Sequence, residues 1–177
     1  VGIFRMQVQG KNNFGCLYGA YSKAARIIAM NDANNKPTEV AIFIGHHPAC
    51  VLTSQTKVPV DTDEFWVMGG ILGEAIELVQ AKSIDVLVPA RAEFVLEGVI
   101  PPNTLVPEGP FGEYPWYYGL ERRSNVINIK TITHRNDAIY HDIFSAHQDH
   151  NYAAKIQREA VLYQRVKVAI PGVKNVS

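Results

Sequence analysis

The sequence has few cysteines, no excess of either charge and no long apolar run. The two cysteines, Cys16 and Cys50, are too few for a disulfide framework, which favours a reducing, cytoplasmic location. Seventeen acidic residues balance seventeen basic ones, so no basic surface indicates nucleic acid or a membrane surface as a partner. No apolar run approaches the roughly 18 residues of a membrane span, and no signal-peptide pattern is present. We therefore expect a small-molecule partner.

Several widespread catalytic motifs are absent as well. The sequence has no Walker loop, no GxGxxG after a strand, no GxSxG and no CxxC pair, which excludes the commonest nucleotide-binding and nucleophilic sites. His147 and His150 have the spacing of a metal pair but lack a third ligand nearby, so a solvated loop is the favoured interpretation. Cys50, between Ala49 and Val51, is typical of a buried thiol rather than a nucleophile.

The pattern of apolar residues indicates an α+β fold, most simply a barrel-like one, in a single domain covering residues 1–177. Strands are predicted at 1–9, 14–18, 39–45, 77–79, 86–88, 93–100, 126–133, 138–144 and 166–170. Helices are predicted at 23–30, 49–54, 63–72 and 152–163. The apolar run 39–45 is typical of a strand buried on both faces, and 126–133 with 138–144 reads as a hairpin. Because the chain starts inside a strand pattern, we expect it to be an internal piece of a longer polypeptide.

The most distinctive stretch is PEGPFGE, residues 107–113, which carries two carboxylates on either side of a Gly-Pro-Phe-Gly turn. Gly-Pro excludes a helix or a central strand, so this is a shaped loop. Such a loop holds Glu108 and Glu113 at a definite relative position, as acid/base chemistry requires. The alternative is a surface turn whose acids are solvated. An aromatic run follows at Tyr114, Trp116, Tyr117 and Tyr118.

Two further charged residues have more than one interpretation. Arg5 lies in the first strand between apolar neighbours, where its fork could bind a substrate carboxylate, although single arginines on strands are usually solvated or structural. Asp61 and Glu64 have the spacing of a capping box for the helix at 63–72. Glu64 could equally be an oxygen ligand of Mg²⁺ or Mn²⁺.

Six stretches follow one another in the order seen in the UbiD family: VGIFRMQVQGKN, IGHHPA, VPVDTDEF, LVPARAEFVLEG, EGPFGEYPWYYG and ITHRNDAIYH. The sequence resembles that family over nearly the whole chain up to about His141. The resemblance implies a reversible decarboxylase that uses prenylated FMN. It also implies the middle region of the family's chain, a flavin-reductase-like split β-barrel with flanking helices.

The resemblance also implies roles for individual residues. Arg5 would hold the substrate carboxylate above the flavin, Glu108 would orient Arg5, and Glu113 would protonate the carbon that has lost CO₂. Glu64 would ligate the Mn²⁺ or Mg²⁺ ion that bridges to the flavin phosphate. The implied flavin-binding residues are Ile3, Phe4, Arg5, Leu17, Tyr18, Ser22 and Glu64. The implied potassium-binding residues are Thr53, Ser54 and Thr56.

The sequence departs from the family pattern at several points. The family's metal-binding asparagine would fall just before Val1, and its metal-binding histidine is expected near position 21, where this sequence has Tyr21. A lysine that reaches the flavin from the family's C-terminal domain has no counterpart here. Trp116 stands where many members have glycine, which would narrow the space beside Glu113. These departures put binding of the cofactor in question, whereas the acids Glu108 and Glu113 are present.

Three functions are consistent with these residues. The resemblance favours a (de)carboxylase core acting on an aromatic or α,β-unsaturated carboxylic acid, in a homo-oligomer formed through a C-terminal domain or with related subunits. A second possibility is a non-catalytic subunit or fragment with a binding or assembly role, which Tyr21 favours. A third is an ordinary flavin-binding barrel for redox work, in which the pair Glu108 and Glu113 has no evident purpose.

Overall fold

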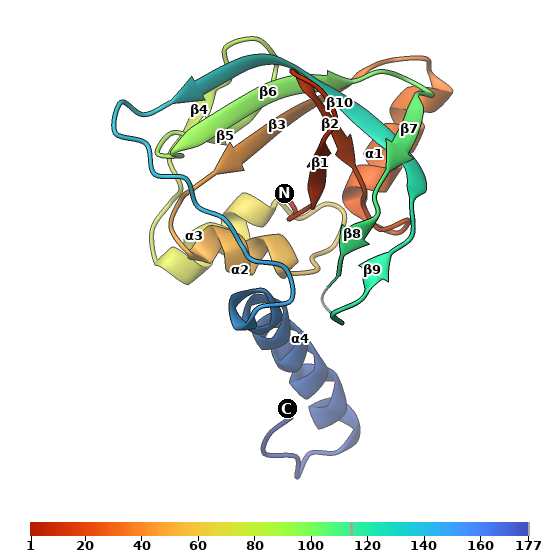
Figure 1. The fold of residues 1–177 in the computed structure, drawn as a ribbon. Helices are drawn as coiled ribbons and strands as arrows, with labels where there is room; N and C mark the ends of the chain where they lie inside the picture. The colour runs from red at the N-terminus through yellow and green to blue at the C-terminus, as the bar shows by residue number, and fades with distance from the viewer. Residues whose placement is uncertain (114, 177) are drawn as a thin grey trace.

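The described part of the chain folds into ten strands and four helices (Figure 1). This computed structural model describes residues 1–113 and 115–176, so Tyr114 of the aromatic run lies outside it, as does Ser177. The strands are β1 (Met6–Val8), β2 (Asn13–Cys16), β3 (Thr38–Ile44), β4 (Leu78–Gln80), β5 (Leu87–Pro89), β6 (Phe94–Ile100), β7 (Leu105–Glu108), β8 (Phe111–Gly112), β9 (Tyr118–Gly119) and β10 (Arg122–His134). The helices are α1 (Lys23–Ala33), α2 (Ala49–Gln55), α3 (Glu64–Leu72) and α4 (Gln148–Ala169).

A six-stranded antiparallel sheet in the order β1-β2-β10-β6-β3 organises the fold, with β7 also paired to β10. The long strand β10 pairs with β2 along one edge and with β7 and then β6 along the other. Two small antiparallel ladders, β4–β5 and β8–β9, complete the strands of the described residues. This pairing brings the start of the chain next to residues just past its midpoint.

The core lies on both sides of this sheet. Ile28 of α1 packs with Cys16, Ile100 and Ile127 of three neighbouring strands, so α1 covers one face. Val95 of β6 packs with residues of the β4–β5 hairpin. A third cluster joins α2 to α3 through Ala49, Cys50 and Met68. Both cysteines are free and buried, which confirms the prediction for Cys50.

Three sequence predictions about strands are wrong. The run 39–45 forms β3, which is an edge strand that pairs only with β6 and is mostly half-buried, because the sheet ends there. Residues 138–144 form no strand. The Arg135 amide donates to the Glu93 carbonyl (3.0 Å), and the Ile139 amide donates to the Glu93 carboxylate (3.1 Å). These bonds hold the turn against Glu93, just before β6, and the chain continues away from β10.

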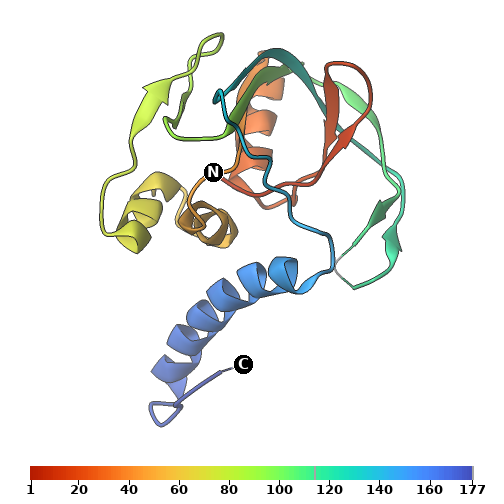
Figure 2. The same cartoon turned by 60° about the vertical axis from the view of Figure 1, so that its left-hand side comes forward.

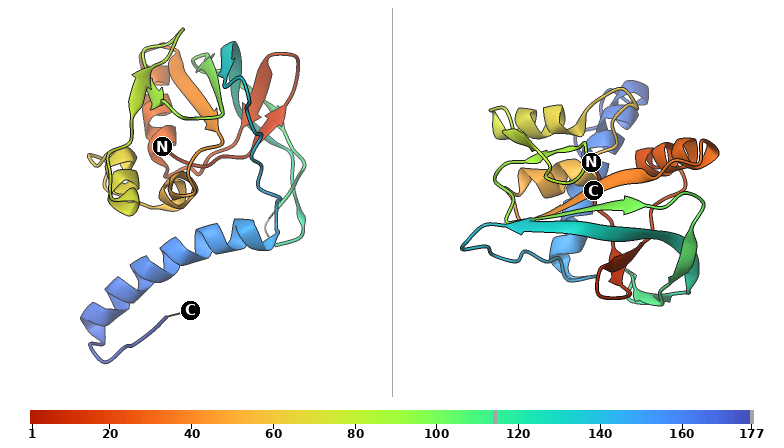
Figure 3. Two further views of the ribbon diagram at one scale, coloured as in Figure 1. Left: turned by 90° about the vertical axis from the view of Figure 1, so that its left-hand side faces the viewer. Right: turned by 90° about the horizontal axis from the view of Figure 1, so that it is seen from above.

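The run 166–170 is the last turn of α4 rather than a strand. Extending a helix that already exists requires no new nucleus, and no strand of the described residues lies beside this run. Lys167 donates to the hydroxyl of Tyr163 one turn earlier at 3.0 Å, which is a helical contact. α4 contacts α2, and Figures 2 and 3 show that the helix then extends away from the sheet.

The start of α3 also differs from the predicted capping box. The N-cap is Asp63, whose carboxylate accepts a hydrogen bond from the Phe65 amide at 2.9 Å, rather than Asp61. Glu64 is the first residue of the helix, and its carboxylate turns away to other partners that are described below. Within the described residues, no helix has both the length and the apolar character required to cross a membrane.

Candidate functional site

Arg5 lies between two glutamates that are more than a hundred residues away in the sequence. Its Nε lies 3.5 Å from Oε1 of Glu108, and its Nη1 contacts Oε1 of Glu113. Arg5 directly precedes β1, Glu108 ends β7, and Glu113 directly follows β8. β2 joins β1 to one edge of β10 and β7 pairs with the opposite edge, and hydrogen bonds from Gln7 and Gln9 join the first segment to residues 107–109.

The pair of Arg5 and Glu108 is buried but incompletely satisfied. The Glu108 side chain is 0% exposed, whereas those of Arg5 and Glu113 are 23% and 35% exposed. Both carboxylate oxygens of Glu108 and the Nε of Arg5 are buried without a hydrogen-bond partner. Buried charged groups are normally hydrogen-bonded, so unsatisfied ones are a characteristic of sites that receive a ligand. Burial, and secondarily the charge of Glu108, raises the pKa of the Cys16 thiol to about 11.

The first strand supports the acidic loop through a row of polar side chains. Arg5, Gln7 and Gln9 alternate along the chain and therefore share one face of the strand. Oε1 of Gln7 accepts a hydrogen bond from the Gly109 amide at 3.0 Å, and Nε2 of Gln9 donates to the Pro107 carbonyl. The sequence prediction missed both glutamines. The signal was present, because three polar residues at every second position mark a face that contacts something polar.

Glu113 is positioned by the β8–β9 turn. Its amide donates to the Tyr117 carbonyl at 2.9 Å, and its carboxylate lies over Gly119, where a β-carbon would be 2.9 Å from Oε1. Phe111 lies under the guanidinium of Arg5, with 4.6 Å from Cζ to the ring centroid. Trp116 sits on the same turn and is 76% exposed, so its effect on the space beside Glu113 stays a prediction.

The predicted flavin-binding residues form two adjacent segments beside this cluster. The β1–β2 ladder ends at the pair Met6 and Cys16, and residues 3–5 and 17–18 continue past it. Backbone groups that leave a ladder side by side can bond a ligand. These segments contain five of the predicted residues, namely Ile3, Phe4, Arg5, Leu17 and Tyr18.

Three of the predicted residues also have structural contacts. Phe4 and Tyr18 pack against the core cluster around Ile127, and the Tyr18 hydroxyl donates to Oδ1 of Asn125. Ser22 is the N-cap of α1, and its hydroxyl oxygen accepts from the Ala25 amide at 3.1 Å. Together with the unsatisfied atoms of Arg5 and Glu108, these segments fit a planar polar cofactor such as a flavin.

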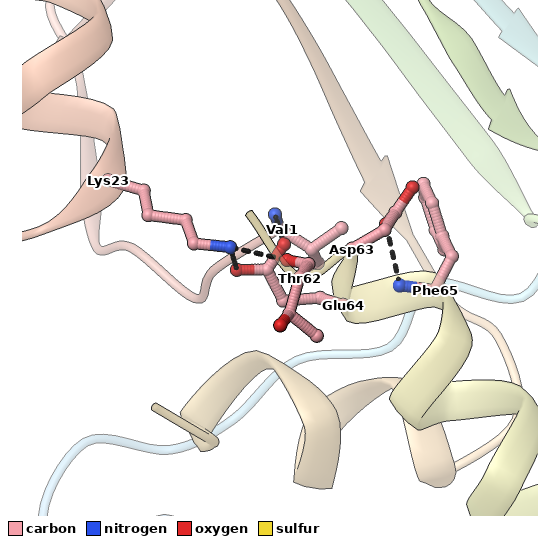
Figure 4. Close-up of polar contacts among 6 residues, drawn as sticks. All are labelled: Val1, Lys23, Thr62, Asp63, Glu64 and Phe65. Carbon is pink, nitrogen blue, oxygen red and sulfur yellow. Dashed lines mark hydrogen bonds and ion pairs between the residues drawn. The ribbon is translucent and has the colours of Figure 1, made fainter. Parts of the chain in front are cut away.

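Glu64 is contacted by the ammonium group of Lys23 (Figure 4). Nζ of Lys23 lies 2.9 Å from its Oε1 and also donates to the Thr62 carbonyl at 2.6 Å. Burial acts to raise the pKa of Glu64, but hydrogen bonds, the first of them from Lys23, outweigh it, and the pKa lies below its ordinary value.

These contacts do not fit a divalent ion held by protein ligands. Tyr21, at the position where a histidine ligand was expected, is fully exposed. Across residues 1–113 and 115–176, no group of three or more His, Cys, Asp or Glu side chains could hold a metal ion. The sequence prediction missed Lys23, whose position on the first turn of α1 faces Glu64 only in the tertiary structure.

The predicted potassium residues lie together at the end of α2. Thr53 is 0% exposed, and its hydroxyl oxygen is buried without a hydrogen-bond partner. The hydroxyls of Ser54 and Thr56 donate to the carbonyls of Val51 (2.7 Å) and Leu52 (3.1 Å). Each of these hydroxyl oxygens keeps an acceptor lone pair. Potassium binding by these three residues stays a prediction, which the Thr53 hydroxyl without a partner supports.

Comparison with known proteins agrees with this geometry. The UbiD family, described as the 3-octaprenyl-4-hydroxybenzoate carboxy-lyase Rift-related domain, matches residues 1–148. The UbiD-class enzyme HmfF from Pelotomaculum thermopropionicum was solved in complex with FMN. It is 40% identical to this chain with a TM-score of 0.96, and the match covers 98% of this chain. An evolved dimeric form of HmfF, solved with prFMN, is 39% identical with a TM-score of 0.95, over 98% of this chain and 40% of that one.

Two other proteins are similar over most of the chain. Vanillic acid decarboxylase from Sedimentibacter hydroxybenzoicus, in its closed form, is 30% identical with a TM-score of 0.90, over 98% of this chain and 37% of that one. The uncharacterized protein sll0936 of Synechocystis is 36% identical over 146 residues, or 82% of this chain. The chain spans 29% of the length of sll0936 and 39% of that of HmfF.

Proposed function

The chain belongs to the UbiD family, and we propose that it carries the catalytic centre of a prenylated-FMN-dependent carboxy-lyase. The substrate class is an aromatic or α,β-unsaturated carboxylic acid. The observation that supports this most directly is the contact of one arginine, Arg5, with both Glu108 and Glu113. The likeness to HmfF and to a vanillic acid decarboxylase supports the same reaction class. The split barrel implied by the family is proposed with it.

Arg5 would bind the substrate carboxylate. A guanidinium donates paired hydrogen bonds that match a carboxylate in geometry and charge. In the structure its Nη1 contacts Glu113, so the substrate would compete with Glu113 for the same donor. Glu108, fully buried beside Nε, would keep the guanidinium oriented and partly neutralise it. Arg5 would therefore position the substrate carboxylate without preventing the release of CO₂.

Glu113 would supply the proton that replaces CO₂. When bound, the prenylated flavin supplies an electron sink for the electron pair that remains as CO₂ departs. A general acid must carry its proton before it acts, and a protonated Glu113 no longer has the charge that attracts Arg5. Protonation of Glu113 would thus make it ready to donate and, at the same time, release Arg5 to bind the substrate carboxylate. In the reverse direction Glu113 would accept the proton.

The remaining family assignments are carried by the segments beside this cluster. We propose that Ile3, Phe4, Leu17, Tyr18 and Ser22 hold the flavin, and that Thr53, Ser54 and Thr56 hold potassium. Thr53 supports the latter through its buried hydroxyl without a partner. The dimeric form of HmfF supports an oligomer for the full polypeptide. A purely non-catalytic assembly role is not favoured, because it gives no reason for an unsatisfied Arg5 and Glu108.

The experiment is to reconstitute the full-length protein with prenylated FMN and to measure CO₂ release from a panel of aromatic and α,β-unsaturated acids. Glu113→Gln keeps the size and polarity of the side chain but cannot donate this proton. We expect it to bind the cofactor normally, by flavin absorbance, and to lose about 100-fold or more of turnover. Glu121→Gln, an exposed residue after the same turn, is the matched control and should keep full activity. Equal activity of both variants would contradict the assignment.

A further inference from the structure

The side chain that faces Glu64 is a cation of the protein itself. We infer that the ammonium group of Lys23 takes the place of the divalent metal ion, so that the flavin phosphate binds this protein without Mn²⁺ or Mg²⁺. This inference rests on the proposed function, because it concerns the phosphate end of the same flavin site. It concerns a different residue set from the decarboxylation chemistry of Arg5 and Glu113.

The contacts of Lys23 resemble those of an ion held in a site. Nζ lies 2.9 Å from Oε1 of Glu64 and 2.6 Å from the carbonyl oxygen of Thr62. The Lys23 side chain is 25% exposed and that of Glu64 is 10% exposed, so the pair is largely withdrawn from solvent (Figure 4). An ammonium has three N–H donors, and these two acceptors use two of them. The third donor and the partial exposure leave Nζ able to bind a phosphate oxygen.

The same contacts leave a divalent ion little to bind. Mg²⁺ requires oxygen ligands at about 2.0–2.1 Å and close to octahedral geometry. Oε1 of Glu64 is taken by an ammonium, which would repel a second cation on the same oxygen. Tyr21 is fully exposed, and no cluster of three His, Cys, Asp or Glu side chains exists among the described residues. Lys23 of α1 thus supplies the positive charge beside Glu64 that a metal ion would otherwise supply.

The test measures binding of FMN, with no turnover required. Full-length protein is titrated with FMN in excess EDTA and again with Mn²⁺, following quenching of flavin fluorescence. We expect the same dissociation constant in both conditions. Lys23→Met should raise that constant in EDTA by roughly tenfold or more, as expected for loss of a hydrogen bond from a charged group. Lys36→Met, an exposed lysine just beyond α1, is the matched control and should change nothing.

Two further measurements keep the test decisive. Riboflavin lacks the phosphate, so its affinity should not change in Lys23→Met if the fold is intact. Lys23→His places a neutral nitrogen ligand beside Glu64, and we expect it to bind Mn²⁺ by electron paramagnetic resonance while the wild type does not.

The outcomes separate the inference from the function. FMN binding by the wild type that requires Mn²⁺ overturns the inference and leaves the proposed function standing. Equal FMN affinity of Lys23→Met and the wild type in EDTA also overturns it. If the wild type binds FMN in neither condition, the proposed function itself fails. Should Lys23→Met not fold, the comparison of the wild type in EDTA and in Mn²⁺ still decides.

Discussion

Single residues set the geometry around Arg5, and the least conspicuous of them is a glycine. Gly119 lies opposite Phe111 in the β8–β9 ladder, and the carboxylate of Glu113 occupies the space where a side chain would be. The oxygen that lies over Gly119 is the one that contacts Arg5. The position of the proposed acid therefore depends on a residue that has no functional group.

Gly119→Ala should impair turnover by moving this carboxylate. The new β-carbon would be 2.9 Å from Oε1 of Glu113, which is too close for real contacts. Because Glu113 is flexible at its end, the fold should survive while the acid shifts. A misplacement of this size typically costs roughly 10- to 100-fold in rate. Turnover and flavin absorbance of the full-length variant are the measurements.

Gly112→Ala is the matched control for this prediction. It lies in the same small ladder, and a β-carbon there would meet no atom within 4 Å. We expect it to keep nearly full activity. If both alanine variants are equally active, Glu113 is not held by Gly119.

At the scale of elements, Glu97 of β6 holds the turn between β4 and β5. Its carboxylate accepts hydrogen bonds from the amides of Lys82 (2.9 Å) and Ser83 (2.6 Å) and from the Ser83 hydroxyl (2.7 Å). Burial acts to raise the pKa of Glu97, but these bonds outweigh it, and the pKa is lower than its ordinary value of 4.5. The charged form is therefore the one that stabilises this part of the fold.

The sign of the pH dependence follows from that direction. A carboxylate with a lowered pKa adds to stability above its unfolded pKa, and this contribution is lost as the pH falls through the folded pKa. Glu97→Gln should cost about 2 kcal/mol at pH 7, and the difference from the wild type should shrink below about pH 4.5. Urea unfolding at several pH values measures it. Exposed Glu74→Gln should show no such trend.

The cap of α3 provides a second test at this scale. Asp63 accepts a hydrogen bond from the Phe65 amide at 2.9 Å, whereas Asp61 is not the cap. Asp63→Ala should lower the free energy of unfolding by about 1 kcal/mol. Asp61→Ala, two residues earlier, should have almost no effect. A larger loss for Asp61 would support the capping box that its spacing first suggested.

At the scale of the whole molecule, α4 stands apart from the sheet. It is the longest helix of the described residues, yet none of its residues is buried (Figure 3). Several large apolar side chains on it are exposed, among them Ile156 and Leu162. Most helical stability in proteins comes from packing of an apolar face, so this helix should be held weakly in the 177-residue chain.

Hydrogen exchange measures this difference in the 177-residue chain. Amides of α4 should exchange faster than those of β10, because local opening costs little where no side chain is buried. The residues of β10 between 124 and 127 are all buried, and each pairs with β2, with β7 or with both, which makes them the internal control. Equal protection of α4 and β10 would show that the helix is packed more tightly than its exposure indicates.

The sequence by itself determined the local features and the candidate acids. The glycines and proline of residues 107–113 predicted a shaped loop, and the structure has a turn at Gly109 and Pro110, between the end of β7 and the start of β8. Alternation along the strands predicted most of the sheet. Those features depend on near neighbours, so a linear pattern contains them. By contrast, the apolar runs 138–144 and 166–170 had strand-like composition, and only their surroundings decided otherwise: Glu93 captured one, and α4 extended through the other.

Only the tertiary structure decided which charges meet. Arg5 could have been a solvated strand residue, and strand pairing across β10 put it between Glu108 and Glu113. Glu64 had two interpretations from its spacing, and its contact with Lys23 joins the first turns of α1 and α3, which are far apart in the sequence. Charge pairing depends on distance in space, and the sequence separation of Lys23 and Glu64 does not determine that distance before the chain folds.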